Sequence, residues 1–344
     1  MNRQILRPHF LRTAIIVFLI VIAAGCNAVS PTPAEPTQAP ATETPAPTPT
    51  ATPVPDKALF VALPSGGAAA GEAARTVVEG LAADNQLLFE ALPGLSAGDL
   101  KPEHRVVVFS GIPDNLAELL TAAPQTQFLV IGAGELPAAA NLSVVRYSPE
   151  EQLFISGFLA TILAGDRRAA GVLTNDGPVG ARAEEVFING GNYFCGTCSP
   201  QYAPFVRFPL TAALPAASDL TAWQGAVDAL HANVVYVYYV TPEAASLDLL
   251  SYVGQKQVAL IGGQTPPDEV RGVWAATVRI DPLPALREMF PALAQGQGGQ
   301  QVGASLEITD VNNQILSPGR KELAERVYAD LGAGLINPFD PPLQ

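Results

Sequence analysis

Cysteine and histidine are scarce in this chain, which has three of each among its 344 residues. Three cysteines are too few for a scaffold held together by disulfides. The histidines His9, His104 and His231 stand apart in the sequence, and each is better explained as a structural or solvated side chain than as a catalytic one. The sequence also has no GxSxG nucleophile elbow and no HExxH motif. We therefore expect a protein that is not an enzyme, with no metal site and no cofactor.

Positive charge is also in short supply, with 19 Lys and Arg against 32 Asp and Glu, for a formal net charge of -13. The first 25 residues carry Arg3, Arg7 and Arg12 and no acid, so their removal would lower the charge by three, to -16. Nucleic acids and anionic membrane surfaces both require positive charge on their partners. The composition therefore disfavours both as partners, although it does not select a ligand.

The apolar run of the N-terminus is short. It covers about 11 residues, from Ala14 to Ala24, whereas a helix that spans a bilayer needs about 20. A basic start followed by such a run is typical of a signal peptide. The run ends in Ala23-Ala24-Gly25-Cys26, which resembles a bacterial lipobox, so we expect lipidation of Cys26 and a lipid anchor on the extracytoplasmic face of the cell membrane. The alternative is an ordinary cleaved signal peptide with a chance cysteine.

Pro, Thr and Ala dominate the next segment, from about residue 27 to 55, and it has no apolar periodicity. Such a composition cannot bury enough apolar surface to fold. Frequent proline favours polyproline II at about 3.1 Å per residue, so a fully extended segment would reach roughly 80–90 Å. We interpret it as a disordered stalk that holds a folded domain away from the membrane.

Strands and helices alternate from Lys57 onward. Expected strands include 58–63, 86–92, 105–109 and 127–131, and expected helices include 69–83 and 114–122. This alternation predicts an α/β fold with a parallel, doubly wound sheet. Ligands bind beyond the carboxyl ends of the strands in such sheets, which singles out Ser65, Gly66, Ser110 and Gly111 as ligand-binding residues. The turn at 64–67 lacks the P-loop and GxGxxG patterns, so its glycines fit a tight turn better than a phosphate site.

The stretch from Tyr147 to Gly177 predicts a helix, a turn and a strand. Ser148 is a natural N-cap, Pro149 follows at the first helical position, and Glu151 completes a capping box. Small residues such as Gly157 and Thr161 form a ridge that would let another element approach closely. The strand 169–174 ends in a turn that begins Asn175-Asp176. We expect the chain to pass here from one lobe to another, with Asn175 and Asp176 at the edge of a ligand cleft.

A second group of candidate ligand-binding residues follows later strands. The run 234–240, VVYVYYV, predicts a strand. Tyr238, Tyr239 and Thr241 lie at or just after its C-terminal end, and a helix is expected over 242–253. The two tyrosines either pack in the core or form an aromatic wall for a flat ligand. Gln264 follows the next expected strand, 258–261, at a position that also faces the cleft.

The motif Cys195-Gly196-Thr197-Cys198 has three interpretations. A zinc site normally needs four ligands, and few other candidates exist. A redox pair needs its thiol at a helix N-terminus, whereas this motif follows an expected helix over 180–193. The favoured interpretation is a short structural disulfide between Cys195 and Cys198 in an oxidising exterior.

Four segments from the middle and the late part of the chain carry a family resemblance: Phe154–Gly157, Gly171–Leu173, Phe187–Gly191 and Ala259–Gln264. Together they resemble the basic membrane protein family of substrate-binding lipoproteins, most clearly over 148–194. The resemblance implies a type I periplasmic-binding-protein architecture, with two Rossmann-like lobes of parallel strands that close on a ligand. Relatives bind purine nucleosides and pass them to an ABC permease. This chain has Gln264 where the family has Asp, and the turn 64–67 lacks the family's Asp, which leaves the ligand open.

These observations divide the chain into five segments: a signal peptide (1–25), the lipidated cysteine and stalk (26–56), a first lobe (57–165), a second lobe (166–280), and a crossover and C-terminal segment that packs back on the lobes (281–344). The favoured function is a lipid-anchored solute-binding protein of an ABC uptake system, with a small and by resemblance nucleoside-like ligand. A sensory module that reports to a membrane partner is one alternative, because the same fold serves both. A thiol-disulfide enzyme built on Cys195 and Cys198 is the other.

Overall fold

The computed structural model describes residues 54–63, 68–134 and 136–340. The signal peptide, Cys26 and nearly all of the stalk lie outside the described residues, as do Ser65 and Gly66. Within the described ranges, no helix is both long enough and apolar enough to cross a bilayer.

Six parallel strands form the first sheet, in the order β11-β5-β4-β3-β1-β2. Its strands are β1 (Lys57–Val61), β2 (Leu88–Leu92), β3 (His104–Phe109), β4 (Gln127–Ala133), β5 (Leu142–Tyr147) and β11 (Gln301–Gly303). Its helices are α1 (Ala68–Asp84), α2 (Leu116–Ala122) and α7 (Leu283–Ala294). Helices α1 and α7 cover one face and α2 the other, so the central strands are buried on both sides, as their unbroken apolar runs require.

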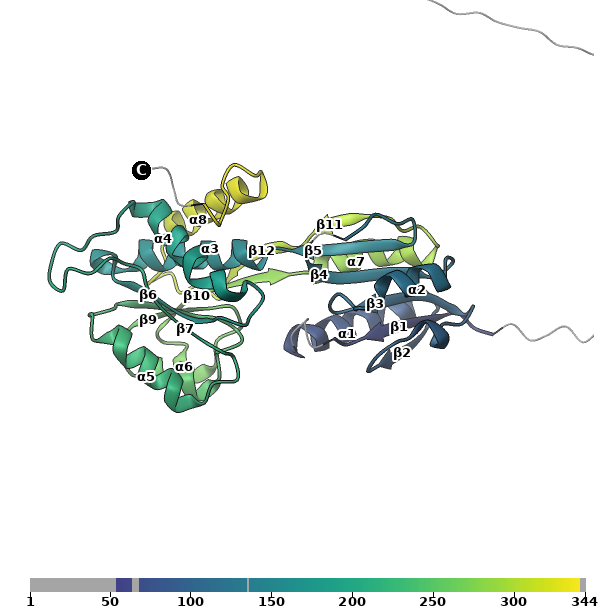
Figure 1. Ribbon diagram of the computed structural model, residues 1–344, viewed down its shortest axis with the longest axis horizontal. Coiled ribbons are helices and arrows are strands. Elements are labelled where there is room, and N and C mark those ends of the chain that lie inside the picture. The colour runs from purple at the N-terminus through teal and green to yellow at the C-terminus, as the bar shows by residue number, and fades with distance from the viewer. Residues whose placement is uncertain (1–53, 64–67, 135, 341–344) are drawn as a thin grey trace, which may run out of the picture. The chain divides into compact units, whose positions relative to one another are not determined.

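A second six-stranded sheet has the order β12-β10-β9-β8-β6-β7, and all its pairs are parallel except β10 with β12. Its strands are β6 (Ala169–Thr174), β7 (Leu210–Leu214), β8 (Val237–Val240), β9 (Ala259–Gly262), β10 (Trp274–Asp281) and β12 (Ser305–Thr309). Its helices are α3 (Pro149–Leu163), α4 (Ala183–Cys195), α5 (Leu220–His231), α6 (Leu247–Gly254) and α8 (Pro318–Gly332). Helices α3, α4 and α8 cover one face, and α5 and α6 cover the other (Figure 1).

The chain passes between the two sheets at three places: from β5 to α3, from β10 to α7, and from β11 to β12. Helix α3 packs against β6, β8 and β10, so it belongs to the second lobe. This corrects the expected boundary at residue 165, because the crossing lies at Ser148. The C-terminal segment is shared, with α7 and β11 in the first lobe and β12 and α8 in the second.

Helices α3 and α4 cross at very short range. A Cβ added to Gly157 of α3 would lie 2.1 Å from the carbonyl oxygen of Phe187, and one added to Gly190 of α4 would lie 2.0 Å from the carbonyl oxygen of Phe154. Only residues without a Cβ allow two helix backbones to approach this closely. The predicted ridge of small residues on α3 is therefore confirmed, and the element that approaches it is α4.

Two expected elements begin later than the sequence suggested. The strand expected from Val234 begins at Val237, because Val234 has a left-handed backbone with φ of 60° that cannot continue a strand. The helix expected from Pro242 begins after Ser246, whose side chain caps it by accepting a hydrogen bond from the backbone N–H of Leu249 at 3.2 Å. Residues 242–245 consequently form a turn at the carboxyl end of β8.

Candidate ligand-binding site

Ser110 and Gly111 follow β3 at the carboxyl edge of the first sheet, as predicted, but both are buried. The Ser110 hydroxyl accepts a hydrogen bond from the backbone N–H of Leu63 at 2.8 Å, and its own backbone N–H donates to the carbonyl of Val61 at 3.1 Å. Ser110 therefore ties the end of β1 to the end of β3. This internal role occupies the hydroxyl that the sequence assigned to a ligand.

Asn175 and Asp176 follow β6 at the carboxyl edge of the second sheet, and both are exposed. The backbone N–H of Asn175 donates to the carbonyl of Leu214, the last residue of β7, at 3.1 Å. One oxygen of the Asp176 carboxylate accepts from the backbone N–H of Ala216 at 2.8 Å. The turn after β6 is thus held in place by the chain that leaves β7, and it presents both polar side chains to solvent.

Thr241 and Glu243 lie beside this turn, because β8 is the direct neighbour of β6. The backbone N–H of Thr241 donates to the carbonyl of Val172 at 3.0 Å. The Thr241 residue is 6% exposed, and its hydroxyl oxygen has no hydrogen-bond partner among the described residues. The Glu243 residue is exposed as a whole, but its carboxyl carbon is only 3.9 Å from where a Cβ on Gly177 would stand. The carboxylate therefore leans toward the turn after β6.

Electrostatics single out Glu243 as the unusual group of this edge. Loss of water around its carboxylate raises the pKa of Glu243, and the negative charge of Asp176 raises it further. Burial raises the pKa of Tyr147 at the end of β5, and the charge of Glu243 adds to that effect. No described Lys or Arg contributes to either shift. Glu243 and Tyr147 were not among the predicted site residues.

Tyr238 and Tyr239 do not form the aromatic wall that was one of their two interpretations. They are 0% and 1% exposed, and their side chains pack on opposite faces of the second sheet. The Tyr238 hydroxyl donates to the carbonyl of Val227 at 3.5 Å, and the Tyr239 ring stacks on Phe187 with 5.8 Å between centroids. Burial raises the pKa of both phenols well above the ordinary value. Core packing is the correct interpretation of this pair.

Gln264 follows β9 at the predicted edge and is partly buried. Its side-chain amide donates to the carbonyl of Ala245 at 3.0 Å, which links it to the turn after β8. Its backbone carbonyl accepts from the hydroxyl of Thr277 at 3.0 Å. Gln264 therefore braces the loop that carries Thr241 and Glu243.

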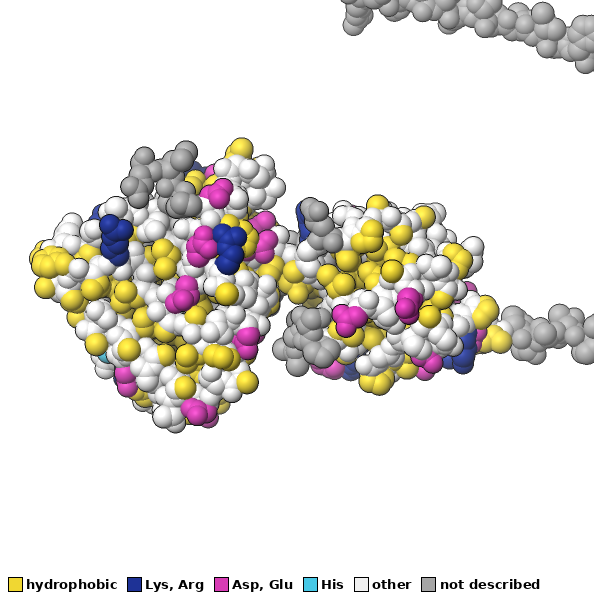
Figure 2. Space-filling view, viewed as in Figure 1, with side chains coloured by type: hydrophobic (Ala, Val, Ile, Leu, Met, Phe, Trp, Pro, Cys, Tyr) yellow, Lys and Arg dark blue, Asp and Glu magenta, His cyan; other side chains and the backbone are white. Residues whose placement is uncertain are grey.

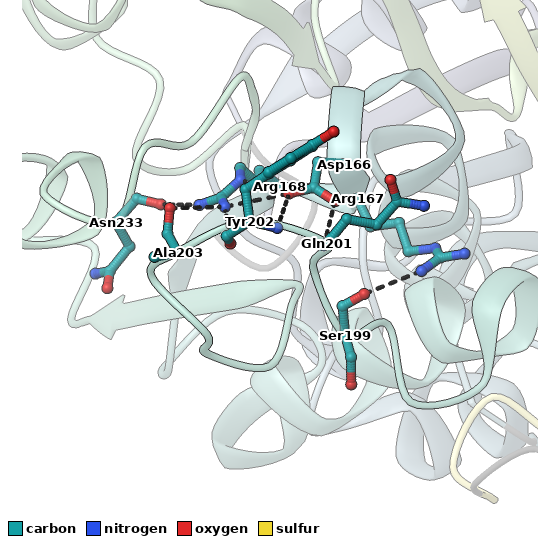
Figure 3. Close-up of polar contacts among 8 residues, drawn as sticks. All are labelled: Asp166, Arg167, Arg168, Ser199, Gln201, Tyr202, Ala203 and Asn233. Carbon is teal, nitrogen blue, oxygen red and sulfur yellow. Dashed lines mark hydrogen bonds and ion pairs between the residues drawn. The ribbon is translucent and has the colours of Figure 1, made fainter.

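Cys195 and Cys198 form a disulfide at the C-terminal end of α4, which is the favoured of the three interpretations. The segment that follows is clamped to η3 (Gly165–Arg167) and its neighbour Arg168 (Figure 3). The Arg168 side chain is 3% exposed and pairs with the carboxylate of Asp166 at 3.1 Å, and Asp166 in turn accepts from the backbone N–H of Gln201 at 2.6 Å. Arg168 also donates to the carbonyls of Tyr202, Ala203 and Asn233.

A cavity of about 420 Å³ lies next to this disulfide, with walls that include Ile188, Asn192, Thr197, Arg207 and Leu210. Leu210 is the first residue of β7, whereas Asn175 contacts the last one. The cavity is therefore at the opposite end of β7 from the carboxyl edge, and it is separate from the candidate site.

No protein-family model and no curated protein sequence matches the chain. Solved structures do match it. An ABC transporter solute-binding protein from Conexibacter woesei is 18% identical, with a TM-score of 0.55 over 82% of this chain and 98% of that one. Another from Aeropyrum pernix is 14% identical, with a TM-score of 0.57 over 84% and 94%. A transcriptional activator of the comK gene from Bacillus halodurans is 11% identical, with a TM-score of 0.56 over 80% and 96%.

The fold is that of type I periplasmic-binding proteins. Two α/β lobes with mainly parallel sheets, in matching order, confirm the fold class predicted from the sequence. Identities below 20% show the fold and leave the ligand open. Membership of the basic membrane protein family stays a prediction, since no family model matches.

Proposed function

We propose that the chain is a solute-binding protein that holds a small molecule at the carboxyl edges of its strands and delivers it to an ABC permease. The observation that carries this proposal is the cluster of Asn175, Asp176, Thr241 and Glu243 at the edge of the second sheet. Ligands of open α/β sheets bind beyond the carboxyl ends of the strands, and these residues lie there. Two solved structures with this fold are themselves ABC solute-binding proteins, which supports the same role.

The proposal includes a lipid anchor at Cys26 and a Pro-rich tether on the extracytoplasmic side of the membrane. Its support is the lipobox-like sequence and the composition that follows. The resemblance to basic membrane proteins makes a nucleoside one ligand to test. Incorporation of labelled palmitate into the full chain, and its loss in Cys26→Ser, tests the anchor. An unlabelled wild-type chain would contradict it.

A sensory role is the second candidate, favoured by the transcriptional activator among the similar structures. A thiol-disulfide enzyme is disfavoured, because Cys195 ends α4 and a helix C-terminus does not lower the pKa of a thiol. Insulin reduction by the wild type that is lost in Cys195→Ala would favour the enzyme.

A thermal-shift screen tests ligand binding directly. The full chain with Cys26→Ser, which avoids the lipid, is screened with nucleosides, sugars, amino acids and small amines. We expect at least one class to raise the melting temperature and to bind with a Kd in the micromolar range or below. Gly225→Ala is the control variant, and it should show the same ligand-induced shift as the wild type. Gly225 lies on α5, outside the candidate site, with no atom within 4 Å of an added Cβ. No shift with any class would contradict the proposed function.

A further inference from the structure

The two carboxylates at the edge of the second sheet have no positive partner among the described residues. The described Arg and Lys side chains of this lobe that form ion pairs have other carboxylates as partners: Arg168 with Asp166, Arg182 with Glu185, Lys256 with Asp228, Arg271 with Asp268, Arg279 with Glu307 and Lys321 with Glu325. One carboxylate oxygen of Asp176 accepts a hydrogen bond from the backbone N–H of Ala216, and the negative charge of Asp176 raises the pKa of Glu243. The edge therefore holds two carboxylates: Asp176, and Glu243, whose carboxyl carbon lies 3.9 Å from the Cβ position of Gly177, the residue next to Asp176.

Thr241 is a second and independent feature of the same edge. It is 6% exposed, and its hydroxyl oxygen has no partner among the described residues. Thr241 directly follows the last residue of β8, and its backbone N–H still donates to the carbonyl of Val172 in β6 at 3.0 Å, so the alternation of the strand places it on the same face as Tyr239. The Tyr239 hydroxyl lies beside Ser156, and the negative charge of Glu243 contributes to the raised pKa of Tyr239. Thr241 lies one residue past the end of β8 and two residues before Glu243, at the same edge of the sheet. Buried hydroxyls are nearly always paired, so an unpaired one points to a group that enters the site.

Gly177, in the turn after β6, has no side chain to cover the Glu243 carboxylate. A Cβ on Gly177 would stand 2.4 Å from the hydroxyl oxygen of Thr174 and 3.9 Å from the carboxyl carbon of Glu243. A side chain at this position would crowd Thr174 and fill the space in front of the Glu243 carboxylate. The absence of a side chain at Gly177 keeps that carboxylate accessible from the turn.

We propose that this edge binds the positively charged nitrogen of a small organic cation, with Glu243 and Asp176 as its counter-charges and the Thr241 hydroxyl as a hydrogen-bond acceptor. This inference rests on the proposed function and assigns the ligand class of that site. An ammonium or amidinium group supplies the donors and the charge that the two carboxylates lack, whereas a neutral ligand leaves their repulsion in place. The net charge of -13, with acidic side chains spread over the face in Figure 2, also draws cations toward the protein.

Titration calorimetry on the full chain with Cys26→Ser tests the ligand class with matched pairs of probes. Putrescine is compared with 1,4-butanediol, and choline with 3,3-dimethyl-1-butanol, so that each pair differs mainly in charge. Arginine amide serves as a larger cation. We expect at least one cation to bind at least tenfold more tightly than the neutral probes.

Three variants then assign the residues. Glu243→Gln keeps the shape of the side chain and removes its charge, and we expect at least a tenfold loss of affinity for the cation. Asp176→Asn and Thr241→Val should each weaken binding severalfold. Glu185→Gln is the control, since Glu185 is an exposed carboxylate on α4 that pairs with Arg182 at 2.9 Å, and it should bind as the wild type does. Circular dichroism establishes that each variant is folded.

The outcomes separate this inference from the proposed function. If adenosine or a sugar binds while no cation does, the ligand class is wrong and the solute-binding role stands. If a cation binds and Glu243→Gln and Asp176→Asn leave its affinity unchanged, the assigned site is wrong. If neither the cations nor any neutral solute of the thermal-shift screen binds, the inference and the proposed function both fail.

Discussion

The contact between α3 and α4 gives the sharpest test of the packing. Gly157→Ala would place a Cβ 2.1 Å from the carbonyl oxygen of Phe187 and 2.9 Å from its carbonyl carbon, both of which belong to the backbone. Ordinary contacts of a Cβ begin near 3.4 Å, so the two helices would have to separate by about 1 Å. No flexible side chain can move aside to relieve the clash.

The magnitude follows from two opposing effects. Alanine is favoured over glycine inside a helix by about 1 kcal/mol. Overpacking of a close-packed interface costs about 1–3 kcal/mol and occasionally more, and a backbone clash at this range belongs at the upper end. Because buried side chains of α3 and α4 share one core cluster with β6, β8 and β10, separation also loosens their contacts with the sheet. We therefore expect Gly157→Ala to lower the free energy of unfolding by about 2 kcal/mol or more.

Urea unfolding followed by circular dichroism measures the effect, with two further variants as references. Gly190→Ala should destabilise by a similar amount, because its Cβ would meet the carbonyl oxygen of Phe154 at 2.0 Å. Gly225→Ala, which meets nothing within 4 Å, should instead stabilise by roughly 0.5–1 kcal/mol. A Gly157→Ala variant as stable as the wild type would refute the close contact between the two helices.

Three further predictions concern the clamped loop, the disulfide and the buried tyrosines. The hydrogen bonds from the backbone N–H groups of Gln201 and Tyr202, with Arg168 nearby, lower the pKa of Asp166. The stabilising contribution of the Asp166 carboxylate is therefore complete when the pH is above its pKa in the unfolded chain, about 3.9, and is lost as the pH falls through its lower pKa in the folded protein. Urea unfolding between pH 2 and 7 should show this loss of stability, and the Asp166→Asn variant should lack this contribution. Removal of the disulfide in a Cys195→Ala, Cys198→Ala double variant should lower the free energy of unfolding by about 2 kcal/mol, as expected for a very short loop, and wild-type protein in reductant should show the same loss. Tyr238→Phe should leave ligand affinity unchanged and cost at most about 1 kcal/mol, because its hydrogen bond is long; an affinity change of tenfold or more would return Tyr238 to the binding site.

Local signals in the sequence were sufficient for much of the second lobe. Helix α3 begins at Pro149, the position predicted from Ser148 and Pro149, although the Ser148 side chain makes no cap hydrogen bond. Strand β6 covers the predicted residues 169–174. Both elements carry their signals within a few residues, since a proline at the first helical turn and a continuous apolar run each act locally. Helix α3 belongs to the second lobe because it packs against β8 and β10, which are far from it in the sequence, and local sequence patterns do not predict such contacts.

Glu243 shows why part of the candidate site was missed. Proline is favoured in the first turn of a helix, so the sequence predicts a helix that begins at Pro242 and includes Glu243. The true cap is Ser246, four residues later, and its hydrogen bond to Leu249 fixes the start of α6. The choice between two plausible helix starts therefore decided whether a carboxylate stood on a helix or at the carboxyl edge of the sheet. A Ser followed by a helical apolar pattern was the signal available in the sequence.

The architecture of the sheet explains why Tyr238 and Tyr239 are buried while Asp176 and Glu243 are exposed. Both faces of a parallel sheet are covered by helices, so a side chain within a central strand is buried whichever way it points. Tyr238 and Tyr239 lie inside β8 and are therefore both in the core, one on each face. Asn175, Asp176 and Glu243 lie one to three residues past the ends of β6 and β8, where the backbone leaves the sheet and side chains reach solvent. In this fold the residues that can meet a ligand are those just beyond a strand, and a strand's own last residues, however suited to a flat ligand, belong to the core.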